Sequence, residues 1–525
     1  MLNNKKTAVV YDKWLSTLGG GEVVACTIAK ILKDSGYDVT FISGKPVSFK
    51  KIKNALGIDL SGIKFKSVWN DELELKQLVE GKDLFINCSF MDYSYGYAKK
   101  NIYYTHFPTE SYTNLKGMIF NRTILPLASK LIKPIEFLSE SPSLININNQ
   151  LAYSLDKPVK IAFSFLNPKK VHLLKFSLFL ENFYFSLLKN LNYKVINSKI
   201  VEKQIIIDHY HNLVHFYIKI KPETTTVYLE ITPPKIKKIH LLNKDRFYLL
   251  YPKIIDLKLP EFIYKLLYEK INTRLRAGVF INILNRLKSY QLILADSEFT
   301  KKWVKNYWKR EAKVLYPPVD FLFEKYDLSK IKKENWLCNV GRFFTLGHGK
   351  KQEVLVEAFK KLYNQGYKNW QLHLIGGVGN EPGTLEFVKY LKKQAKGYPI
   401  YFHFDIPRKK VEEILVKSKI YWHATGFGEK KPIKMEHFGI APIEAMSAGC
   451  VPVLYNGGGL TEIIEKLNLN PAIHLFSGKS QLIENTKKII KENIKIKEEI
   501  FIKLTNLFSK NKFNKNLLKL LNEKI

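Results

Sequence analysis

Short apolar runs alternate with longer amphipathic stretches along most of the chain. Thr7 to Tyr11 is a largely apolar run, glycines follow at 19–21, and Glu22 to Ser35 then repeats apolar positions at helical spacing before Gly36. Asp38 to Ile42 is a second apolar run. Continuous apolar runs are typical of strands that are buried on both faces, so this opening predicts a strand, a helix and a parallel strand.

The same pattern recurs in two series. Further runs in the first series are Leu84 to Cys88, Ile102 to Thr105 and Leu292 to Ala295. The second series has a helical pattern near Val354 to Tyr363 and apolar runs at Trp336 to Val340, Gln371 to Ile375, Ile400 to Phe404, Ile420 to His423 and Val451 to Leu454. We therefore expect an α/β protein with two Rossmann-like domains, whose ligands bind at the carboxyl ends of parallel strands.

The residues between about 113 and 285 fit neither series. Val214 to Ile220 and Val227 to Ile231 alternate apolar and polar positions, which predicts a hairpin, and Leu173 to Leu191 is typical of an apolar helix. We interpret the region as a large insertion in the first domain. The expected division is 1–112 and 286–318 for the first domain, with its linker at Leu315 to Val319, 113–285 for the insertion, 319–495 for the second domain and 496–525 for a C-terminal helical segment that can pack back on the first domain.

Composition narrows the class of protein. A content of 46% apolar and 25% charged residues excludes a wholly disordered or fibrous chain. The 84 Lys and Arg residues against 48 Asp and Glu residues give a net charge of +36, which attracts nucleic acid, an anionic membrane or phosphorylated substrates alike. Four widely separated cysteines lack metal-ligand spacing and are expected to be buried, reduced thiols.

No stretch has the roughly 18 uninterrupted apolar residues that a membrane span needs. The most apolar candidate, Val171 to Leu188, is interrupted by His172, Lys175 and Glu181, and no secretory signal opens the chain. We expect a cytoplasmic protein that is soluble or peripheral on the cytoplasmic membrane face.

The strongest chemical signal is a pair of acids around a glycine loop. Glu436 opens the segment EHFGIAPIE, which ends at Glu444, and Gly449 follows. Pro442 suits a first helical turn and Gly449 suits a helix end, so Glu444 is expected early on a short helix and Glu436 in the loop before it. Amides at a helix start can receive a diphosphate, and carboxylates accept hydrogen bonds from sugar hydroxyls.

This pair resembles the motif of the retaining GT-B glycosyltransferases of family 4, the glycosyl transferases group 1. The resemblance implies that Glu436 lies against the donor sugar and that Glu444 binds the ribose of the nucleotide. It also implies that backbone amides of Phe438, Gly439 and Ile440 lie near the sugar and phosphate. Among relatives, the segments around His106 and Glu436 are most similar to enzymes that mannosylate lipid-linked oligosaccharides.

Basic and glycine-rich positions complete the resemblance. Arg342 and Lys350 follow a predicted strand, where two fixed cations can stabilise a departing diphosphate without a metal. The loop between them is longer than the family's, so Lys351 is an alternative to Lys350. Gly20 and Gly21 precede a helix whose amides can approach an anion. Gly376 and Gly377 are expected to shape the nucleotide pocket.

Two further positions follow predicted strands. By resemblance, His106 would reach into the interdomain cleft near the transferring sugar. Asp296 occupies a position where the family usually has asparagine, so its role as a ligand is not implied.

The expected activity is transfer of a sugar from a nucleoside-diphosphate sugar, either GDP-mannose or a UDP-sugar, to a glycan or polyprenyl-linked acceptor hydroxyl, with retention and with no metal or other cofactor. Association with an anionic membrane would fit the basic charge. A nucleic-acid-binding protein is the first alternative, but we find no recognisable binding module in the sequence, and no nucleic acid is expected as a partner. An inactive GT-B scaffold is the second, and retention of both acids and both cations argues against it.

Overall fold

The computed structural model describes residues 5–68, 72–109, 286–344, 349–379 and 383–523. In the insertion it describes 136–137, 144–147, 150–154, 158–164, 170–180, 191–208, 213–224, 226–232, 247–255 and 284. Contacts divide the chain into two compact units. Unit 1 contains Met1–Trp69, Lys76–Glu110 and Arg286–Ile525, and unit 2 contains Asn70–Leu75 and Ser111–Asn285.

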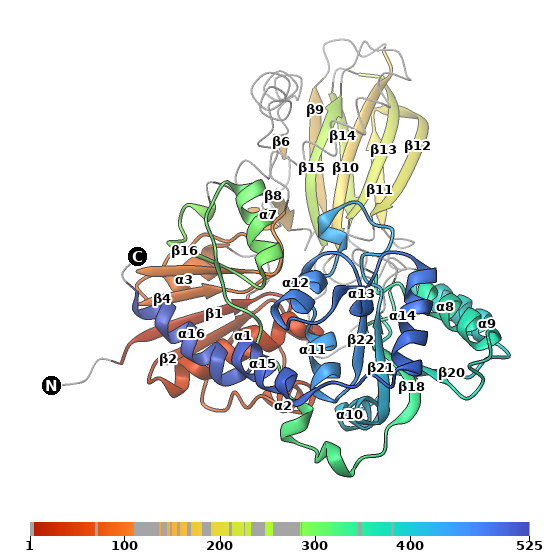
Figure 1. The fold of residues 1–525 in the computed structure, drawn as a ribbon. Helices are drawn as coiled ribbons and strands as arrows, with labels where there is room; N and C mark the ends of the chain where they lie inside the picture. The colour runs from red at the N-terminus through yellow and green to blue at the C-terminus, as the bar shows by residue number, and fades with distance from the viewer. Residues whose placement is uncertain are drawn as a thin grey trace. The chain divides into compact units, whose positions relative to one another are not determined.

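The first half of unit 1 is built on a seven-stranded parallel sheet (Figure 1). Its order is β17-β16-β5-β4-β1-β2-β3, so the chain reverses direction of travel between β1 and β4. The strands are β1 (Thr7–Asp12), β2 (Asp38–Ser43), β3 (Lys64–Ser67), β4 (Leu84–Asn87), β5 (Lys100–Thr105), β16 (Leu292–Ala295) and β17 (Lys313–Val314). The helices are α1 (Gly20–Asp34), α2 (Phe49–Leu56), α3 (Glu72–Val79) and α7 (Glu298–Trp308). The reversal at β1 and β4 is where open α/β sheets bind ligands.

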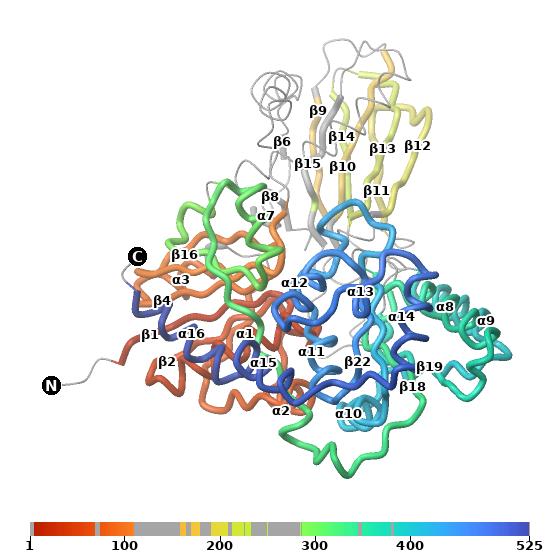
Figure 2. The backbone as a smooth tube through the Cα atoms, viewed as in Figure 1, coloured from red at the N-terminus to blue at the C-terminus, as the bar shows by residue number. Residues whose placement is uncertain are grey.

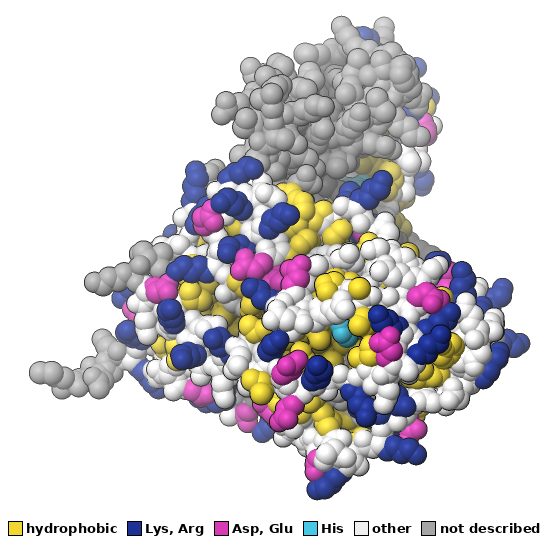
Figure 3. Space-filling view, viewed as in Figure 1, with side chains coloured by type: hydrophobic (Ala, Val, Ile, Leu, Met, Phe, Trp, Pro, Cys, Tyr) yellow, Lys and Arg dark blue, Asp and Glu magenta, His cyan; other side chains and the backbone are white. Residues whose placement is uncertain are grey.

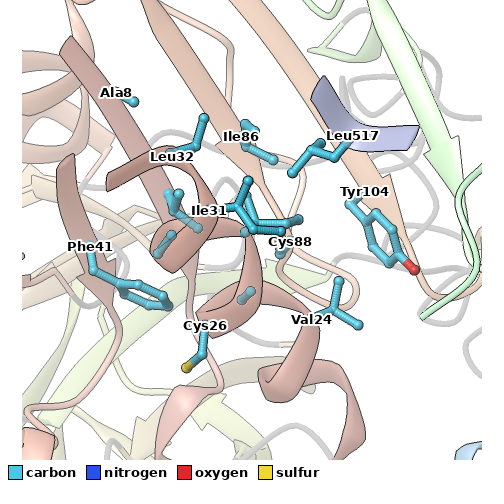
Figure 4. Packing of buried hydrophobic residues seen from close by; sticks show 14 of the residues in the cluster. Ala8, Val24, Cys26, Ile31, Leu32, Phe41, Ile86, Cys88, Tyr104 and Leu517 are labelled. Carbon is cyan, nitrogen blue, oxygen red and sulfur yellow. The ribbon is translucent and has the colours of Figure 1, made fainter. Parts of the chain in front are cut away.

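Helix α1 packs on this sheet through its apolar face. Val24, Ile31 and Leu32 of α1 are buried against Phe41 of β2 and Ile86 of β4 (Figure 4). The helix starts at Gly20, two residues before the predicted start at Glu22. The Glu22 carboxylate accepts the Gly19 N–H at 2.5 Å, which stabilises this first turn.

The second half of unit 1 has a six-stranded parallel sheet of order β20-β19-β18-β21-β22-β23. The strands are β18 (Glu334–Val340), β19 (Gln371–Gly376), β20 (Ile400–Phe404), β21 (Ser418–His423), β22 (Val451–Tyr455) and β23 (Leu475–Phe476). The helices are α8 (Gln352–Asn364), α9 (Thr384–Ala395), α10 (Arg408–Lys417), α11 (Ile440–Ser447), α12 (Gly459–Lys466), α13 (Pro471–His474), α14 (Lys479–Lys491) and α15 (Glu498–Phe508). This strand order is that of a Rossmann domain, with its reversal between β18 and β21.

The chain crosses between the two halves twice at one place. Val319, at the end of the proline linker, pairs with Ser509, and its N–H donates to the Phe508 carbonyl at 2.9 Å. Beyond Ser509, helix α16 (Lys510–Asn522) buries Phe513 and Leu517 in the core of the first half. Figure 2 shows this blue C-terminal end running beside the first red and orange segments.

Unit 2 is an antiparallel β-sandwich in its described parts. One sheet has the order β12-β13-β10-β15-β8-β7 and the other β11-β14-β9-β6. The strands are β6 (Glu136–Phe137), β7 (Leu144–Ile147), β8 (Gln150–Ser154), β9 (Val159–Ser164), β10 (His172–Leu180), β11 (Asn192–Ile196), β12 (Ser198–Asp208), β13 (Leu213–Pro222), β14 (Thr226–Thr232) and β15 (Phe247–Ile255). Side chains from both sheets, such as Phe176 of β10 and Leu229 of β14, share one core.

Two predictions for the insertion are wrong. Instead of the helix expected from Leu173, strand β10 runs to Leu180, and the remainder of that stretch, 181–190, lies outside the described residues. The predicted hairpin consists of two real strands, β13 and β14, but these belong to different sheets. Apolar runs of this length satisfy either a buried helix or a buried strand, and only packing decides between them.

The fold class is confirmed: two Rossmann-like halves accompany a large insertion in the first. The cysteine prediction is also confirmed, since Cys26, Cys88, Cys338 and Cys450 are buried and free. Among the described helices, none is long and apolar enough to cross a membrane.

Candidate active site

The loop that carries Glu436 packs against a glycine turn at the start of α12. A Cβ atom at Gly458 would lie 2.2 Å from the Glu436 carbonyl oxygen, and one at Gly459 would lie 2.2 Å from the carbonyl oxygen of His437. The Gly459 N–H donates to the Glu436 carbonyl at 2.8 Å. Only glycine allows this approach, so the turn fixes the position from which the Glu436 side chain projects.

The Glu436 carboxylate is held by two groups from different elements. Its Oε2 lies 2.7 Å from Lys350 Nζ and 2.7 Å from His423 Nε2. The side chains of Lys350 and Glu436 are 15% and 14% exposed, so the ion pair is shielded yet reachable from solvent. Lys350 therefore forms an ion pair with Glu436 and also lies beside the position expected for a diphosphate.

His423 is buried at the carboxyl end of β21. Burial lowers its pKa, although the adjacent Glu436 carboxylate opposes this, so the imidazole is neutral at physiological pH. A neutral ring that donates Nε2–H to Glu436 leaves Nδ1 as an acceptor, 3.2 Å from the Tyr421 hydroxyl. Thr425 Oγ1 lies 2.9 Å from Nε2. The ring thus presents one fixed donor to the acid.

Glu444 lies in α11, which begins two residues before the predicted Pro442 start. Arg408, at the start of α10, forms a bidentate pair with it: Nη2 lies 2.7 Å from Oε1 and Nη1 lies 3.2 Å from Oε2. Arg408 Nε also donates to Glu412 at 3.0 Å. Bidentate pairing orients the carboxylate as well as stabilising its charge.

Two other segments approach the glycines that begin α1. A Cβ atom at Gly20 would lie 3.1 Å from Ile440 Cδ1, and one at Gly21 would lie 3.2 Å from the His106 ring. Ile440 begins α11 in the second half, so the two halves meet at this turn. The structure therefore brings together Gly20, Gly21, His106 and the Glu436 to Ile440 loop.

His106 is half-buried, and burial lowers its pKa to about 4, so its imidazole is neutral near pH 7. Its Nε2 lies 3.1 Å from the Cys88 carbonyl, which requires the Nε2–H tautomer. Because Nε2 donates to the Cys88 carbonyl, only Nδ1 of the ring can accept a hydrogen bond from a ligand.

Arg342 follows β18 and is exposed, with its guanidinium carbon 5.1 Å from the Phe344 ring. The backbone beneath it is packed closely: a Cβ atom at Gly376 would lie 2.1 Å from the Gly341 carbonyl oxygen. The Phe343 N–H donates to the Gly377 carbonyl at 2.9 Å. These contacts join the ends of β18 and β19 into one rim. Residues 345–348, within the lengthened loop, lie outside the described residues.

Phe438 and Gly439 shape the loop between Glu436 and α11. The Phe438 ring is buried and stacks 5.7 Å from that of Tyr316, and Gly439 precedes α11 with a φ of 111°. The predicted role of their amides in donor binding stays a prediction.

A cavity of about 700 Å³ opens between the two halves of unit 1. Its second-half wall consists of the ends of β18 and β19 and the start of α10: Val340, Ile375, Gly376, Gly377, Asp405, Ile406, Pro407, Arg408 and Val411. Its first-half wall is Leu18 and the α2 region: Ser48, Lys50, Lys51, Asn54 and Ala55. The volume is within the range of small-ligand sites.

Asp296 is buried at the end of β16. Burial raises its pKa to about 8, and the carboxylates of Glu462 and Glu436 add to the rise. The Ser297 hydroxyl lies 3.0 Å from its Oδ1 and 2.7 Å from the His437 carbonyl. Asp296 is thus protonated at neutral pH, beside the contact between the halves.

Further contacts tie the halves together. Phe107 stacks on His437 with ring centroids 4.3 Å apart. Glu462 of α12 accepts the Glu298 and Phe299 N–H groups at 3.0 and 3.1 Å, and the Tyr316 hydroxyl at 2.6 Å. A carboxylate at the start of α7 is favourable because the free amides of a helix start are partly positive.

His423, Arg408 and Asp405 are site residues that the sequence pattern did not single out. His423 ends a predicted strand, Asp405 follows one and Arg408 begins the next helix, which was an available signal. Without side-chain geometry, however, nothing distinguished them from other polar residues at strand ends. In the part of the chain that the structure describes, no cluster of His, Cys, Asp or Glu could hold a metal ion.

The family model of the glycosyl transferases group 1 matches residues 321–511. Three similar curated proteins each bear the name GDP-Man:Man(3)GlcNAc(2)-PP-Dol alpha-1,2-mannosyltransferase. That of Xenopus laevis is 29% identical over 180 residues, 32% of this chain and 34% of its own length. That of Caenorhabditis elegans is 28% identical over 222 residues, 40% of this chain and 45% of its own, and that of Homo sapiens is 26% identical over 181 residues, 32% and 34%. The matches thus span less than half of these relatives.

Solved structures extend the likeness over the whole chain. The crystal structure of Anabaena Alr3699/HepE in complex with UDP and glucose superposes with a TM-score of 0.51 at 12% identity, covering 99% of this chain and 100% of that one. The structure of the same protein in complex with UDP-glucose has a TM-score of 0.50 at 13% identity, covering 99% of each chain. At this identity the likeness concerns the fold.

Proposed function

We propose that this chain, which carries a glycosyl transferases group 1 domain over residues 321–511, is a glycosyltransferase that uses GDP-mannose as donor. The observation that carries the proposal is the arrangement of Glu436 and Glu444 at the edge of the second sheet. Both acids are pre-oriented by cations, and Ile440, which lies between them in the sequence, approaches Gly20 of the first half. The names of the relatives favour a mannosyl donor and a lipid-linked glycan acceptor.

The donor would lie across the cleft with its diphosphate near the start of α1. The amides of Gly20 and Gly21 would face the phosphates, and Arg342 would add positive charge from the opposite side. Lys350 would bridge the diphosphate and Glu436. Glu444, oriented by Arg408, would accept the ribose hydroxyls.

The reaction would retain the anomeric configuration. The bond between the anomeric carbon and the diphosphate oxygen breaks, and the acceptor oxygen bonds to that carbon on the same face of the sugar. The acceptor proton passes to the departing diphosphate oxygen. The cations and amides stabilise the charge that develops there, and losing one such contact typically costs about 3 kcal/mol, or roughly a hundredfold in rate. This scheme needs no metal.

The acceptor would be a polyprenyl-linked oligosaccharide, and the enzyme would act at a membrane face. The net charge of +36 supports attraction to anionic lipids. Binding to vesicles of phosphatidylserine and phosphatidylcholine, compared with phosphatidylcholine alone, tests this. Equal binding to both kinds of vesicle would contradict electrostatic attraction of the chain to anionic lipids.

A donor panel is the direct test of the proposed activity. The chain is incubated with GDP-mannose, UDP-glucose and other nucleotide sugars, with and without EDTA, and with short polyprenyl-diphosphate oligosaccharides. We expect mannosyl transfer from GDP-mannose, insensitivity to EDTA and an α-linked product by NMR. Glu436→Ala should abolish transfer while GDP binding survives. Glu484→Ala, a change at an exposed acid of α14, serves as the control.

Two outcomes would redirect the proposal. Absence of transfer from every donor, in a chain that still binds nucleotide, would favour an inactive scaffold. Affinity for RNA or DNA that falls steeply with salt would favour a nucleic-acid-binding protein. On the face shown in Figure 3, however, Lys and Arg side chains are spread over several elements with acidic side chains among them.

A further inference from the structure

One part of the cavity wall is suited to a planar base. Ile406, Pro407 and Val411 contribute apolar surface on the side of α10, and Val340 and Ile375 contribute it from the strand ends. Apolar walls with few polar groups are typical of sites that bury an aromatic ring and orient it through a small number of hydrogen bonds.

This inference rests on the proposed function, which assigns positions to the diphosphate and the ribose of the nucleotide. Leu18, next to the glycine turn, lines the cavity near the position expected for the diphosphate. Arg408 lines it too and holds Glu444, the expected ribose ligand. The wall formed by Asp405, Ile406 and Pro407 is therefore left for the base.

Asp405 is the acidic residue of this cavity wall. It lies in the turn after β20 with a left-handed φ of 50°, and its Oδ2 accepts the Val378 N–H at 3.4 Å. A Cβ atom at Gly377 would lie 3.2 Å from Oδ1, so the glycine leaves room for the carboxylate. Within the described ranges, no cation lies within ion-pair distance of Asp405.

The chemistry of a carboxylate separates the nucleobases. A carboxylate only accepts hydrogen bonds, and its two oxygens match two adjacent donors. Guanine offers such a pair, N1–H and the N2 amino group. Uracil offers a single N3–H between two carbonyl oxygens, which a carboxylate repels, and adenine presents an acceptor at N1.

We propose that Asp405 reads the donor's base and selects guanine, so that the cavity admits GDP-sugars and disfavours UDP-sugars. Lys50 and Lys51 on the facing α2 wall are donors that suit the O6 and N7 acceptors of guanine or the phosphates. Because the carboxylate is in place before the ligand arrives, the discrimination acts on binding of the nucleotide itself.

Binding of GDP, IDP and UDP to the full chain, measured by titration calorimetry, tests this directly. IDP lacks only the N2 amino group, so it reports on the second of the two hydrogen bonds. A bidentate contact predicts that the wild-type chain binds GDP about 10- to 100-fold more tightly than UDP, and IDP at an intermediate affinity.

Asp405→Asn is the informative variant, because asparagine tolerates a left-handed backbone and can still accept the Val378 N–H. We expect it to lose the preference for GDP over IDP and to bind GDP at least about tenfold more weakly, with UDP binding unchanged or tighter. Asp34→Asn, at an exposed position near the end of α1, should change none of these affinities.

The outcomes separate this inference from the proposed function. An unchanged GDP to IDP ratio in Asp405→Asn, or equal binding of GDP and UDP by the wild-type chain, overturns base reading while sugar transfer still stands. A chain that binds no nucleotide and transfers no sugar overturns both.

Discussion

Replacing Asp296 by asparagine should stabilise the protein at neutral pH. Asp296 is 4% exposed, and burial first, then the nearby Glu462 and Glu436, raises its pKa to about 8. In the unfolded chain the same carboxyl has a pKa of about 3.9. Between these two values the folded protein keeps a proton that the unfolded chain releases, so stability falls as the pH rises.

The size of the effect follows from the two pKa values. Each pH unit between them costs the wild-type protein about 1.4 kcal/mol, so the accumulated cost at pH 7 is roughly 4 kcal/mol as an upper bound. Asparagine has nearly the same shape and retains an acceptor for the Ser297 hydroxyl, 3.0 Å away, but cannot ionise. The variant should therefore lack this loss.

Urea unfolding at half-unit steps from pH 5 to 8.5 measures the difference. The seven tryptophans provide the fluorescence signal, and two of them, Trp303 and Trp308, lie on the α7 helix that follows Asp296. The stability advantage of Asp296→Asn should grow with pH and level off above about pH 8. Sugar transfer should be retained, because asparagine keeps the shape of the side chain and its acceptor for the Ser297 hydroxyl. An advantage that stays constant from pH 5 to 8, or a variant that is less stable throughout, would refute the reasoning.

Three further changes test other contacts. Gly376→Ala would place a Cβ 2.1 Å from the Gly341 carbonyl oxygen, so we expect a loss of roughly 1–3 kcal/mol in stability and weaker GDP binding, measured by thermal shift with and without GDP. His423→Phe removes the donor 2.7 Å from Glu436, so kcat should fall at least about tenfold while GDP affinity is kept; unchanged kcat would show that Lys350 alone orients the acid. Glu462→Ala removes the acceptor for two amides of α7 and for the Tyr316 hydroxyl, so small-angle scattering should show a larger mean separation of the two halves. An unchanged separation would show that other contacts, such as the stacking of Phe107 on His437, hold the halves together.

The sequence by itself determined the two parallel sheets and predicted the edge of each sheet at which ligands would bind. Runs such as Thr7 to Tyr11 and Val451 to Leu454 are apolar on both faces, and a strand of this kind can be buried only between helices of an α/β layer. The glycines and acids at the strand ends then predicted a ligand site there, because ligands bind where parallel strands end.

Only the tertiary structure decided how those residues are paired. Lys350 and His423 are 86 and 13 residues from Glu436, and Arg408 is 36 residues from Glu444, yet all are in contact. The partner of a polar group is set by packing of distant segments, which local spacing does not encode. The same holds for the insertion, where an apolar stretch such as Leu173 to Leu180 becomes a strand because neighbouring strands supply its hydrogen bonds.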